Sequence, residues 1–330
     1  MEGENENNGK RVCVTGGTGF VASSLIFKLL QTGYSVNTTL RSFPEKKKDI
    51  TYLTNLAGAS ERLQIFNADL DKPDSFGPAI EGCIGVFHVA HPIDFQGKES
   101  EEQLTKRAIN GTLGILNASI NAKTVKKFVY TSSIATVASV NNGQEIVDEM
   151  VWSDIDSLQR SNVLAAVYSI TKTLTEKTCL EFGEKHGLDV ICVLPSCIHG
   201  PFLTPTMPGS VVGAMSMIFG YGDLLNLLSI PFVHIDDVVR AHIFLFENPR
   251  AKGRYICSAT EITMENLAEF LAARYPQYPI IPHCPSESKA SKIPKVSSKK
   301  LLDIGFNYKY GLDEMFDDAI RCCKEKGILN

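Results

Sequence analysis

The 330-residue sequence has no apolar stretch that reaches the roughly 20 residues a membrane-spanning helix requires. Residues 1–10 are polar and acidic, without the apolar core of a signal peptide. A broad basic tract is also missing, since the only tight cationic run ahead of the C-terminus is Lys46, Lys47 and Lys48, and the net charge is -4 with a pI near 6.0. These absences predict a cytoplasmic protein that binds neither membranes nor nucleic acid.

The cysteines form no pattern that predicts a disulfide or a metal site. There are nine of them, an odd number, and they are scattered and often flanked by apolar residues, as at Cys13, Cys192 and Cys257. Cys322 and Cys323 are adjacent, but no further cysteine or histidine lies at metal-ligand spacing. We therefore expect reduced thiols, no structural disulfide and no zinc.

What is present is a regular alternation in the first 195 residues between short, β-branched apolar runs and longer helical patterns. This alternation is typical of βαβ units and a parallel sheet. Helical spacing is clearest at 20–31 and 104–121. The expected strands are 11–15, 35–40, 63–66, 85–89, 127–131 and 189–194. We predict an α/β fold with a Rossmann-type, doubly wound parallel sheet.

The regular alternation ends at Pro195, where loops rich in proline and glycine begin. Further helices are expected at 237–247, 264–275 and 312–326. We predict a dinucleotide-binding domain at 10–195, with 232–257 returning to it, and a smaller substrate-binding cap made of 196–231 and 258–330. Because ligands of open parallel sheets bind outside the carboxyl ends of the strands, the cap should close over that edge.

A glycine-rich turn from Gly16 to Ala22 follows the first expected strand directly and leads into a helix. Glycines allow a tight turn and a close approach of backbone to a pyrophosphate, and the helix N-terminus offers unpaired N–H groups. The third small position, Ala22, serves helix–strand packing. A turn without a ligand is the alternative, but the strand before it and the helix after it favour a dinucleotide site.

Residues after the second and third strands predict how the adenosine half is bound. An NAD enzyme usually has an acid at the end of the second strand, whereas this strand runs into Arg41, and the next acid is Glu45. A guanidinium can clamp a 2′-phosphate, with Lys48 as a second cation, so NADPH is favoured over NADH. The alternative for Arg41 is a solvated surface residue. Asp69 could accept a bond from the adenine amino group or cap a helix that starts near Pro73.

Tyr168 and Lys172 lie four residues apart in a helical pattern, so they share one face. A free tyrosine, with a pKa of about 10, is a weak acid near neutral pH, and a neighbouring ammonium is expected to lower that pKa. The fifth strand ends in Ser132 and Ser133, whose hydroxyls could orient a substrate oxygen, although serines after strands are often turn formers. With the glycine turn, these residues predict carbonyl reduction with Tyr168 as the proton donor.

These residues and several other segments resemble the plant dihydroflavonol reductase family of extended short-chain dehydrogenases/reductases, over essentially the whole chain beyond residue 10. The resemblance rests on 12–20 (VCVTGGTGF), 33–36, 68–70, 85–90 (GVFHVA), 123–125, 130–133, 233–237 (VHIDD), 241–243 and 253–258 (GRYICS). Within that family the chain is most similar to the vestitone reductase branch, at 35–39, 53–56 and 315–320.

The resemblance implies a reductase that uses NADPH/NADP+ and acts on C=O or CH–OH groups. It places the catalytic residues on Ser133, Tyr168 and Lys172, and the 2′-phosphate site on Arg41 and Lys48. Together with the glycine turn, it implies further coenzyme contacts at Thr15, Gly16, Gly19, Phe20, Val21, Asp69, Leu70, Val89, Ala90, Tyr168, Lys172 and Pro195.

Three positions depart from the family pattern and are candidate substrate residues: His91, Ala138 and His199. Ala138 replaces an asparagine that dihydroflavonol reductases use to hold a flavonoid ring. Our hypothesis is that His91 and His199 both face the substrate, the alternative being hydrogen-bonded structural roles. The asparagine-tryptophan-tyrosine signature of cinnamoyl-CoA reductases is missing before Lys172, so a thioester substrate is not expected.

The expected function is reduction of a ketone on a polycyclic plant specialised metabolite, either isoflavonoid-like, flavonoid-like or alkaloid-like. Oxidation of an alcohol or hemiacetal in alkaloid biosynthesis and an anthocyanidin-type reduction are the alternatives. A sugar-nucleotide epimerase would more naturally carry an acid at Arg41, and a non-enzymatic NADP-sensing protein could dispense with Tyr168. The expected partner is a small-molecule substrate, bound by a monomer or a weak homodimer.

Overall fold

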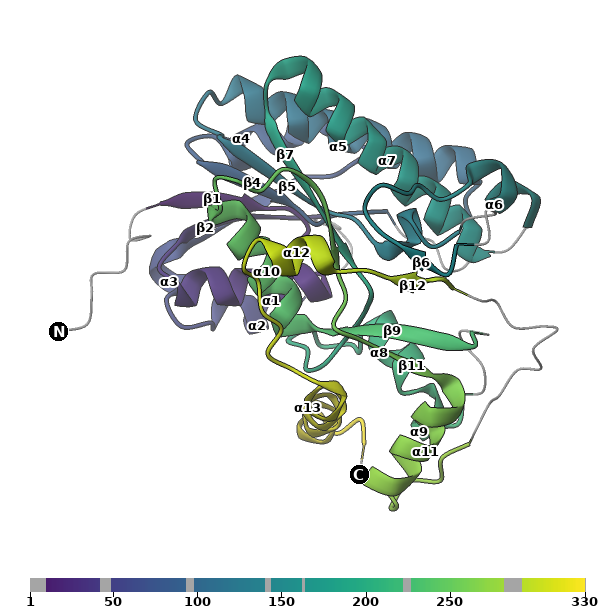
Figure 1. The fold of residues 1–330 in the computed structure, drawn as a ribbon. Coiled ribbons are helices and arrows are strands. Elements are labelled where there is room, and N and C mark those ends of the chain that lie inside the picture. The colour runs from purple at the N-terminus through teal and green to yellow at the C-terminus, as the bar shows by residue number, and fades with distance from the viewer. Residues whose placement is uncertain are drawn as a thin grey trace.

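The computed structural model describes residues 10–41, 49–92, 98–139, 144–161, 164–221, 227–281 and 293–329. Its main layer is a seven-stranded sheet of order β10-β7-β5-β4-β1-β2-β3 in which every pair is parallel (Figure 1). The strands are β1 (Arg11–Val14), β2 (Ser35–Leu40), β3 (Leu63–Asn67), β4 (Gly85–His88), β5 (Lys127–Thr131), β7 (Asp189–Pro195) and β10 (Gly253–Cys257). The predicted Rossmann-type doubly wound sheet is confirmed.

Helices cover both faces of this sheet (Figure 1). On one face lie α1 (Phe20–Gln31) and α10 (Ile235–Glu247), and on the other α5 (Glu101–Asn121) and α7 (Leu164–His186). Side chains of a strand alternate between the two faces, so Val12 and Val14 join the first core and Cys13 joins the second. No helix in the described ranges is long and apolar enough to cross a membrane.

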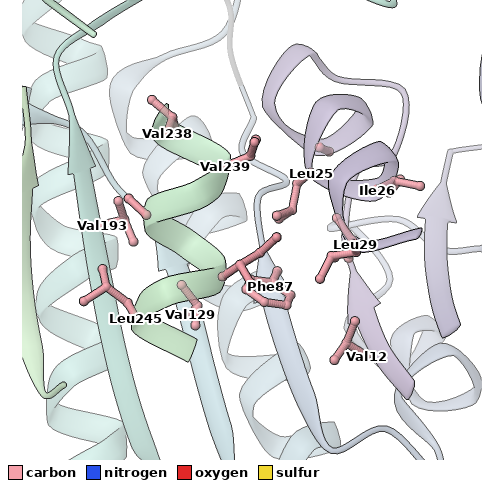
Figure 2. Close-up of a cluster of buried hydrophobic side chains, with 14 of the residues drawn as sticks. Val12, Leu25, Ile26, Leu29, Phe87, Val129, Val193, Val238, Val239 and Leu245 are labelled. Carbon is pink, nitrogen blue, oxygen red and sulfur yellow. The ribbon is translucent and has the colours of Figure 1, made fainter. Parts of the chain in front are cut away.

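The first core shows why the apolar spacing of α1 matters (Figure 2). Leu25 and Leu29 are four residues apart on one face of the helix and are fully buried. They meet Phe87 of β4 and the valines of α10, a helix more than 200 residues away in sequence that packs beside α1. Two distant segments therefore form one layer over the carboxyl half of the sheet.

A second, three-stranded sheet forms the base of the cap, with order β11-β9-β8. It consists of β8 (Cys197–His199), β9 (Ser229–His234) and β11 (Thr260–Thr263), packed with α8 (Gly209–Ala214), α9 (Ser216–Phe219), α11 (Met264–Arg274) and α13 (Leu312–Glu325). Residues 232–234, predicted with the return to the dinucleotide domain, lie instead in β9. The chain re-enters the main layers with α10, because β9 pairs with β8 and β11.

The remaining elements are short and connect these layers. They are the helices α2 (Thr51–Thr54), α3 (Ala59–Arg62), α4 (Gly77–Ile80), α6 (Ile155–Ser161) and α12 (Lys299–Asp303), the 3₁₀ turns Pro73–Phe76 and Ile134–Thr136, and the parallel strand pair β6 (Ile146–Val147) and β12 (Lys295–Val296). The β6–β12 pair ties the segment after β5 to the C-terminal part of the chain.

Candidate active site

A cavity of about 570 Å³ lies at the carboxyl edge of the main sheet, where ligands of such sheets bind. One end is formed by the glycine turn and by residues that follow β2 and β3, and the other by residues that follow β5 and β7. Of the predicted residues, those that line it are Gly16, Gly19, Phe20, Val21, Arg41, Asp69, Leu70, Val89, Ala90, His91, Ser133, Tyr168, Lys172 and Pro195. Most of the predicted site is thus brought together in one cavity.

The glycine turn forms a backbone cradle with no room for side chains. Gly16 has a φ of +74°, and a Cβ on it would lie 3.1 Å from the Cα atom of Ala90. The N–H of Gly19, the residue before α1, donates to the carbonyl of Gly16 over 2.9 Å. The turn therefore leaves the N-terminus of α1 open to the cavity, an arrangement that fits a pyrophosphate.

Thr15, predicted as a coenzyme contact, does not line the cavity. Its side chain is fully buried, and its Oγ1 accepts hydrogen bonds from the N–H groups of Val89 (3.1 Å) and Ala90 (3.0 Å). The same oxygen lies 2.9 Å from Nδ1 of His88. Thr15 therefore shapes the segment after β4 that does line the cavity.

The end of the cavity beside β2 and β3 combines the predicted Arg41 and Asp69 with an arginine that was not predicted. Arg41 follows β2 and lines the cavity, whereas Lys48 lies outside the described residues. Asp69 also lines it, and its Oδ1 accepts from the N–H of Asp71 over 3.2 Å. The Pro73–Phe76 turn is preceded by Lys72, so the alternative that Asp69 caps it is wrong. Arg107 of α5, which sequence reasoning missed, completes this end.

Tyr168 and Lys172 of α7 face Ser133, which follows β5. Nζ of Lys172 donates to the carbonyl of Thr131 over 2.8 Å and lies 6.0 Å from the centre of the Tyr168 ring. Burial lowers the pKa of Lys172 to about 7, although the carboxylate of Glu176 acts in the opposite direction. The end of β5 thus holds the ammonium of Lys172 near the phenol of Tyr168.

The pKa of Tyr168 differs in direction from the sequence-based expectation. We expected the ammonium of Lys172 to lower it, but burial raises this pKa above 10, and a hydrogen bond with Ser133 opposes that rise only in part. The expectation failed because a spacing of four residues says nothing about loss of solvent. A raised pKa keeps the phenol protonated near neutral pH, which is the form that donates a proton.

Ser133 also has the turn-forming role that we gave as an alternative. Its backbone is extended at the start of the Ile134–Thr136 turn, and its Oγ accepts from the N–H of Ala135 over 3.2 Å. Its single hydroxyl hydrogen is directed at the phenolic oxygen of Tyr168, so the two side chains meet through a hydrogen bond in the cavity. Ser132, the other candidate, instead points its hydroxyl at Glu176 over 2.5 Å.

The three substrate candidates have different positions. His91 lines the cavity with its ring edge-on to Tyr168, at 6.0 Å between ring centres, and its Nε2 is buried without a hydrogen-bond partner among the described residues. His199 does not line the cavity: it is fully buried, 4.4 Å between ring centres from Phe316. The hypothesis that His199 faces the substrate is therefore wrong, because the strand turns its side chain toward the cap core. Ala138 does not line the cavity either.

Several lining residues had no signal in the sequence. The cap contributes Cys197, Ile198 and residues 208–210, and Ser196 has a buried Oγ without a hydrogen-bond partner in the described structure. These residues belong to no motif, and their position depends on how the cap folds over the sheet. They line the same cavity as Tyr168.

A model of the NAD dependent epimerase/dehydratase family matches residues 12–257. The chain belongs to this family. The match covers the glycine turn, the three predicted catalytic residues Ser133, Tyr168 and Lys172, and the strand β10. The protein is an NAD(P)-dependent oxidoreductase of the short-chain dehydrogenase/reductase type, so the predicted enzyme class and nicotinamide cofactor are confirmed.

Several curated relatives of this chain are named as plant enzymes. Vestitone reductase of Medicago sativa is 49% identical over 320 residues, which cover 97% of this chain and 98% of that protein. Noscapine synthase SDR1 of Papaver somniferum is 45% identical, covering 99% and 96%. Dihydroflavonol 4-reductase of Callistephus chinensis is 42% identical, covering 98% and 89%. The predicted resemblance to the dihydroflavonol reductases is confirmed.

Solved structures of reductases have the same fold over nearly the whole chain. The crystal structure of vestitone reductase from alfalfa has a TM-score of 0.87 and 46% identity, covering 97% of this chain and 99% of that one. Yeast methylglyoxal/isovaleraldehyde reductase Gre2, crystallised with NADPH, has a TM-score of 0.82 and 25% identity, covering 97% and 100%. Both similarities extend over the sheet and the cap together.

Proposed function

We propose that this family member is an NADPH-dependent reductase of a ketone on a polycyclic plant metabolite, flavonoid-like, isoflavonoid-like or alkaloid-like. The observation that supports it best is that Ser133, Tyr168 and Lys172 line the same cavity as the glycine turn and Arg41. A proton donor thus lies in one space with a cradle for a dinucleotide. Similarity to vestitone and dihydroflavonol reductases supports the substrate class.

The described residues fit NADPH along the whole cavity. The turn at Gly16 and Gly19 and the N-terminus of α1 would hold the pyrophosphate, and Arg41 the 2′-phosphate. Asp69 would contact the adenine, and Pro195 would lie over the nicotinamide end. When bound, NADPH supplies the hydride for the reduction.

The chain's own residues handle the proton. Tyr168 holds a proton on its phenolic oxygen, since burial raises its pKa, and donates it to the oxygen of the reduced carbonyl. The Ser133 hydroxyl donates a hydrogen bond to the same oxygen and orients it. The ammonium of Lys172 stabilises the phenolate that remains on Tyr168. In the oxidative direction the same groups would accept the proton.

His91 is the best candidate for a substrate contact. Its unpartnered Nε2 and its edge-on contact with Tyr168 place a neutral imidazole next to the proposed proton donor, and burial keeps its pKa well below 6.5. Such a nitrogen can exchange a hydrogen bond with a hydroxyl or ether oxygen of the substrate. The unpartnered Oγ of Ser196 provides a second polar group in the same cavity wall.

The test is a turnover screen of NADPH with isoflavanones, flavanonols and alkaloid ketones, with product stereochemistry assigned. In the variant Tyr168→Phe, kcat for the best substrate should fall by about 10²–10⁴, because the proton donor is lost. Ser169→Ala, on the same helix with a hydroxyl bonded to the Ala165 carbonyl, should leave kcat unchanged. Undiminished turnover by Tyr168→Phe would refute the mechanism.

A second candidate is oxidation of an alcohol or hemiacetal on an alkaloid-like compound. The similarity to noscapine synthase SDR1 favours including it. The same screen, run with NADP+ and alkaloid alcohols, compares the two directions on one preparation. A kcat/KM that is higher for oxidation than for every ketone would favour this second function.

A further inference from the structure

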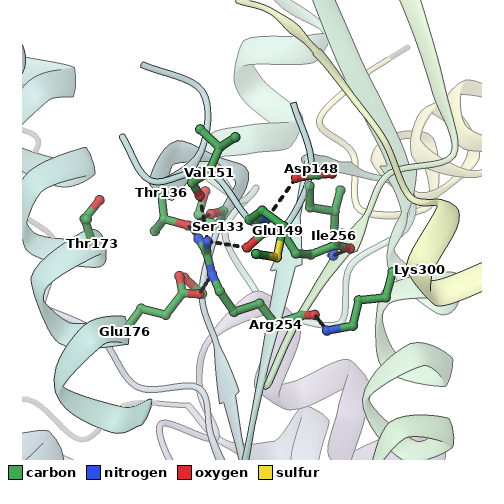
Figure 3. Close-up of polar contacts among 12 residues, drawn as sticks. Ser133, Thr136, Asp148, Glu149, Val151, Thr173, Glu176, Arg254, Ile256 and Lys300 are labelled. Atoms are coloured by element: carbon green, nitrogen blue, oxygen red, sulfur yellow. Dashed lines mark hydrogen bonds and ion pairs between the residues drawn. The ribbon is translucent and has the colours of Figure 1, made fainter. Parts of the chain in front are cut away.

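A buried ion pair between Glu176 and Arg254 lies near Ser133, one of the proposed catalytic residues (Figure 3). Glu176 is on α7, one helical turn after Lys172, and is fully buried. One carboxylate oxygen accepts from Oγ of Ser132 over 2.5 Å, and the other accepts from Nε of Arg254 over 2.6 Å. Glu176 does not line the cavity, so it reaches the reaction only through its neighbours.

Ser132 begins a loop, residues 132–136, that follows β5. Arg254, on β10, contacts the other end of this loop. Its Nη2 donates to Oγ1 of Thr136 over 3.0 Å, and Thr136 bonds back to the carbonyl of Ser133 through its N–H (3.1 Å) and its hydroxyl (3.0 Å). Its Nη1 donates to the carbonyls of Glu149 and Val151. The guanidinium has fixed partners on every side and is only 6% exposed.

The ion pair thus connects the two segments that carry the proposed catalytic residues, α7 and the segment after β5, with the edge strand β10. Glu176 fixes α7, with Tyr168 and Lys172, to the start of the loop, and Arg254 fixes the end of the loop to the edge strand. A buried ion pair adds little net stability compared with apolar side chains of similar size. We therefore expect the ion pair to contribute mainly by fixing the positions of α7 and of the segment after β5.

We propose that Glu176, held by Arg254, is a positioning residue of this site, which fixes the Ser132–Ser133 loop against α7 and supplies the negative charge that faces the Lys172 ammonium. The inference rests on the proposed roles of Ser133, Tyr168 and Lys172. In this proposal Glu176 takes no direct part in the reaction. It keeps Lys172 charged and holds Ser133 in position.

The surroundings of Lys172 leave Glu176 as the charged group opposite it. The other titratable groups that face the ammonium come from α7, β4, β5, β7 and the segment after β4, and they are Cys179, His88, Tyr130, Cys192 and His91. Burial raises the pKa of both thiols and of the phenol, and lowers that of both imidazoles, so all are neutral near pH 7. The Glu176 carboxylate, paired with Arg254, is the counter-charge.

The decisive variant is Glu176→Gln, which keeps the shape and the ability to accept hydrogen bonds but removes the charge. The pKa of Lys172, about 7 in the parent protein, should fall by about one pH unit or more. It is measured by NMR of isotopically labelled lysine in protein without coenzyme or substrate, the Lys172 resonance being the one that Lys172→Met lacks. Glu181→Gln, at an exposed position of the same helix, should leave the titration unchanged.

Activity gives a second readout in the folded variant. Because the reaction needs the charged ammonium, the alkaline limb of the pH–kcat profile should move to lower pH in Glu176→Gln, and Glu176→Asp should restore its position. A lower kcat with an unmoved limb would mean a structural role alone. Turnover retained in Tyr168→Phe would refute the proposed function instead, without affecting the Lys172 titration, which needs no substrate.

If Glu176→Gln does not fold, the parent protein itself carries the test. The hydroxyl hydrogen of Ser132, which the buried Glu176 side chain accepts, should exchange slowly with solvent throughout the pH range in which Lys172 titrates. A Ser132 hydroxyl that exchanges freely with solvent, or a Lys172 titration that is the same in Glu176→Gln and the parent, would overturn the proposal.

Discussion

NADPH and NADH differ by a single phosphate group, so under the proposed function Arg41 is the side chain on which coenzyme choice should depend. Arg41 follows β2 at the adenosine end of the cavity, where its guanidinium can form paired, charge-assisted hydrogen bonds with a 2′-phosphate. A hydroxyl at the same position would offer no charge to the guanidinium. The energy that separates the two coenzymes should therefore be concentrated at this residue.

Arg41→Gln should weaken NADPH binding by about 10–100-fold, the equivalent of one charge-assisted hydrogen bond, and leave NADH binding almost unchanged. Coenzyme fluorescence titration measures both affinities without turnover. Lys252→Gln, which removes an exposed cation outside the cavity lining, is the control. An equal loss for both coenzymes would show that Arg41 does not contact the 2′-phosphate.

Residues whose roles follow from local spacing could be predicted from the sequence. Gly16 follows a strand directly, and Tyr168 and Lys172 share a helix face, so their placement in the cavity needed no tertiary information. Glu176 and Arg254 are 78 positions apart, and their pairing depends on the return of the chain to the sheet. Burial, which sets the direction of the Tyr168 pKa, also depends on tertiary packing.

Among the elements, α5 has the most complete N-terminal cap. Ser100 Oγ accepts from the N–H of Gln103 over 3.2 Å, and the Gln103 side chain accepts from the N–H of Ser100 over 3.2 Å. This capping box starts the helix at Glu101, three residues before the first apolar position at Leu104, where we had predicted its start. Apolar spacing could not reveal a first turn that is polar and exposed.

Ser100→Ala should lower the free energy of unfolding by about 1 kcal/mol, because the N–H of Gln103 loses its acceptor. Urea unfolding followed by circular dichroism measures the change. Lys106→Ala, at an exposed position inside the same helix, leaves the cap intact and should change stability by no more than a few tenths of a kcal/mol. Equal effects of the two substitutions would show that the cap does not stabilise α5.

Six of the seven strands of the main sheet were predicted to within one residue at each end, whereas β10 was predicted only as part of the return to the dinucleotide domain, and the small sheet was not predicted at all. β8 and β11 have only three and four residues, and their pairing with β9 joins segments about 30 residues apart. A strand this short has too few alternations for its period to be recognised. The cap residues that line the cavity were missed for the same reason.

Across the whole molecule, buried neutral histidines make stability depend on pH. Burial lowers the pKa of His88 and His199 to about 3 and that of His242 to about 4. The unfolded chain binds protons at about 6.5, so the stability from neutral imidazoles is complete above that pH and is lost as the pH falls toward these lower values. Acid should therefore begin to destabilise the protein at a pH above the range in which carboxylates titrate.

Between pH 7 and 5.5 the free energy of unfolding should fall by about 3 kcal/mol or more, as three imidazoles become protonated only on unfolding. Urea unfolding at the two pH values measures the difference. His199→Leu should reduce it by about 1 kcal/mol, since neither ring nitrogen has a hydrogen-bond partner in the described structure. His186→Gln, at an exposed site, is the control, and a pH dependence unchanged by His199→Leu would contradict the prediction.

The position of β10 has a consequence for how the protein is made. This edge strand lies next to β7 in space but leaves the ribosome almost 60 residues later, after only the first part of the cap has been synthesised. Until it arrives, the emerging chain has no guanidinium for Glu176, and the carboxylate must stay hydrated. The main sheet therefore cannot finish burying Glu176 before β10 has been synthesised. A nascent chain that stops before residue 254 should remain dependent on chaperones.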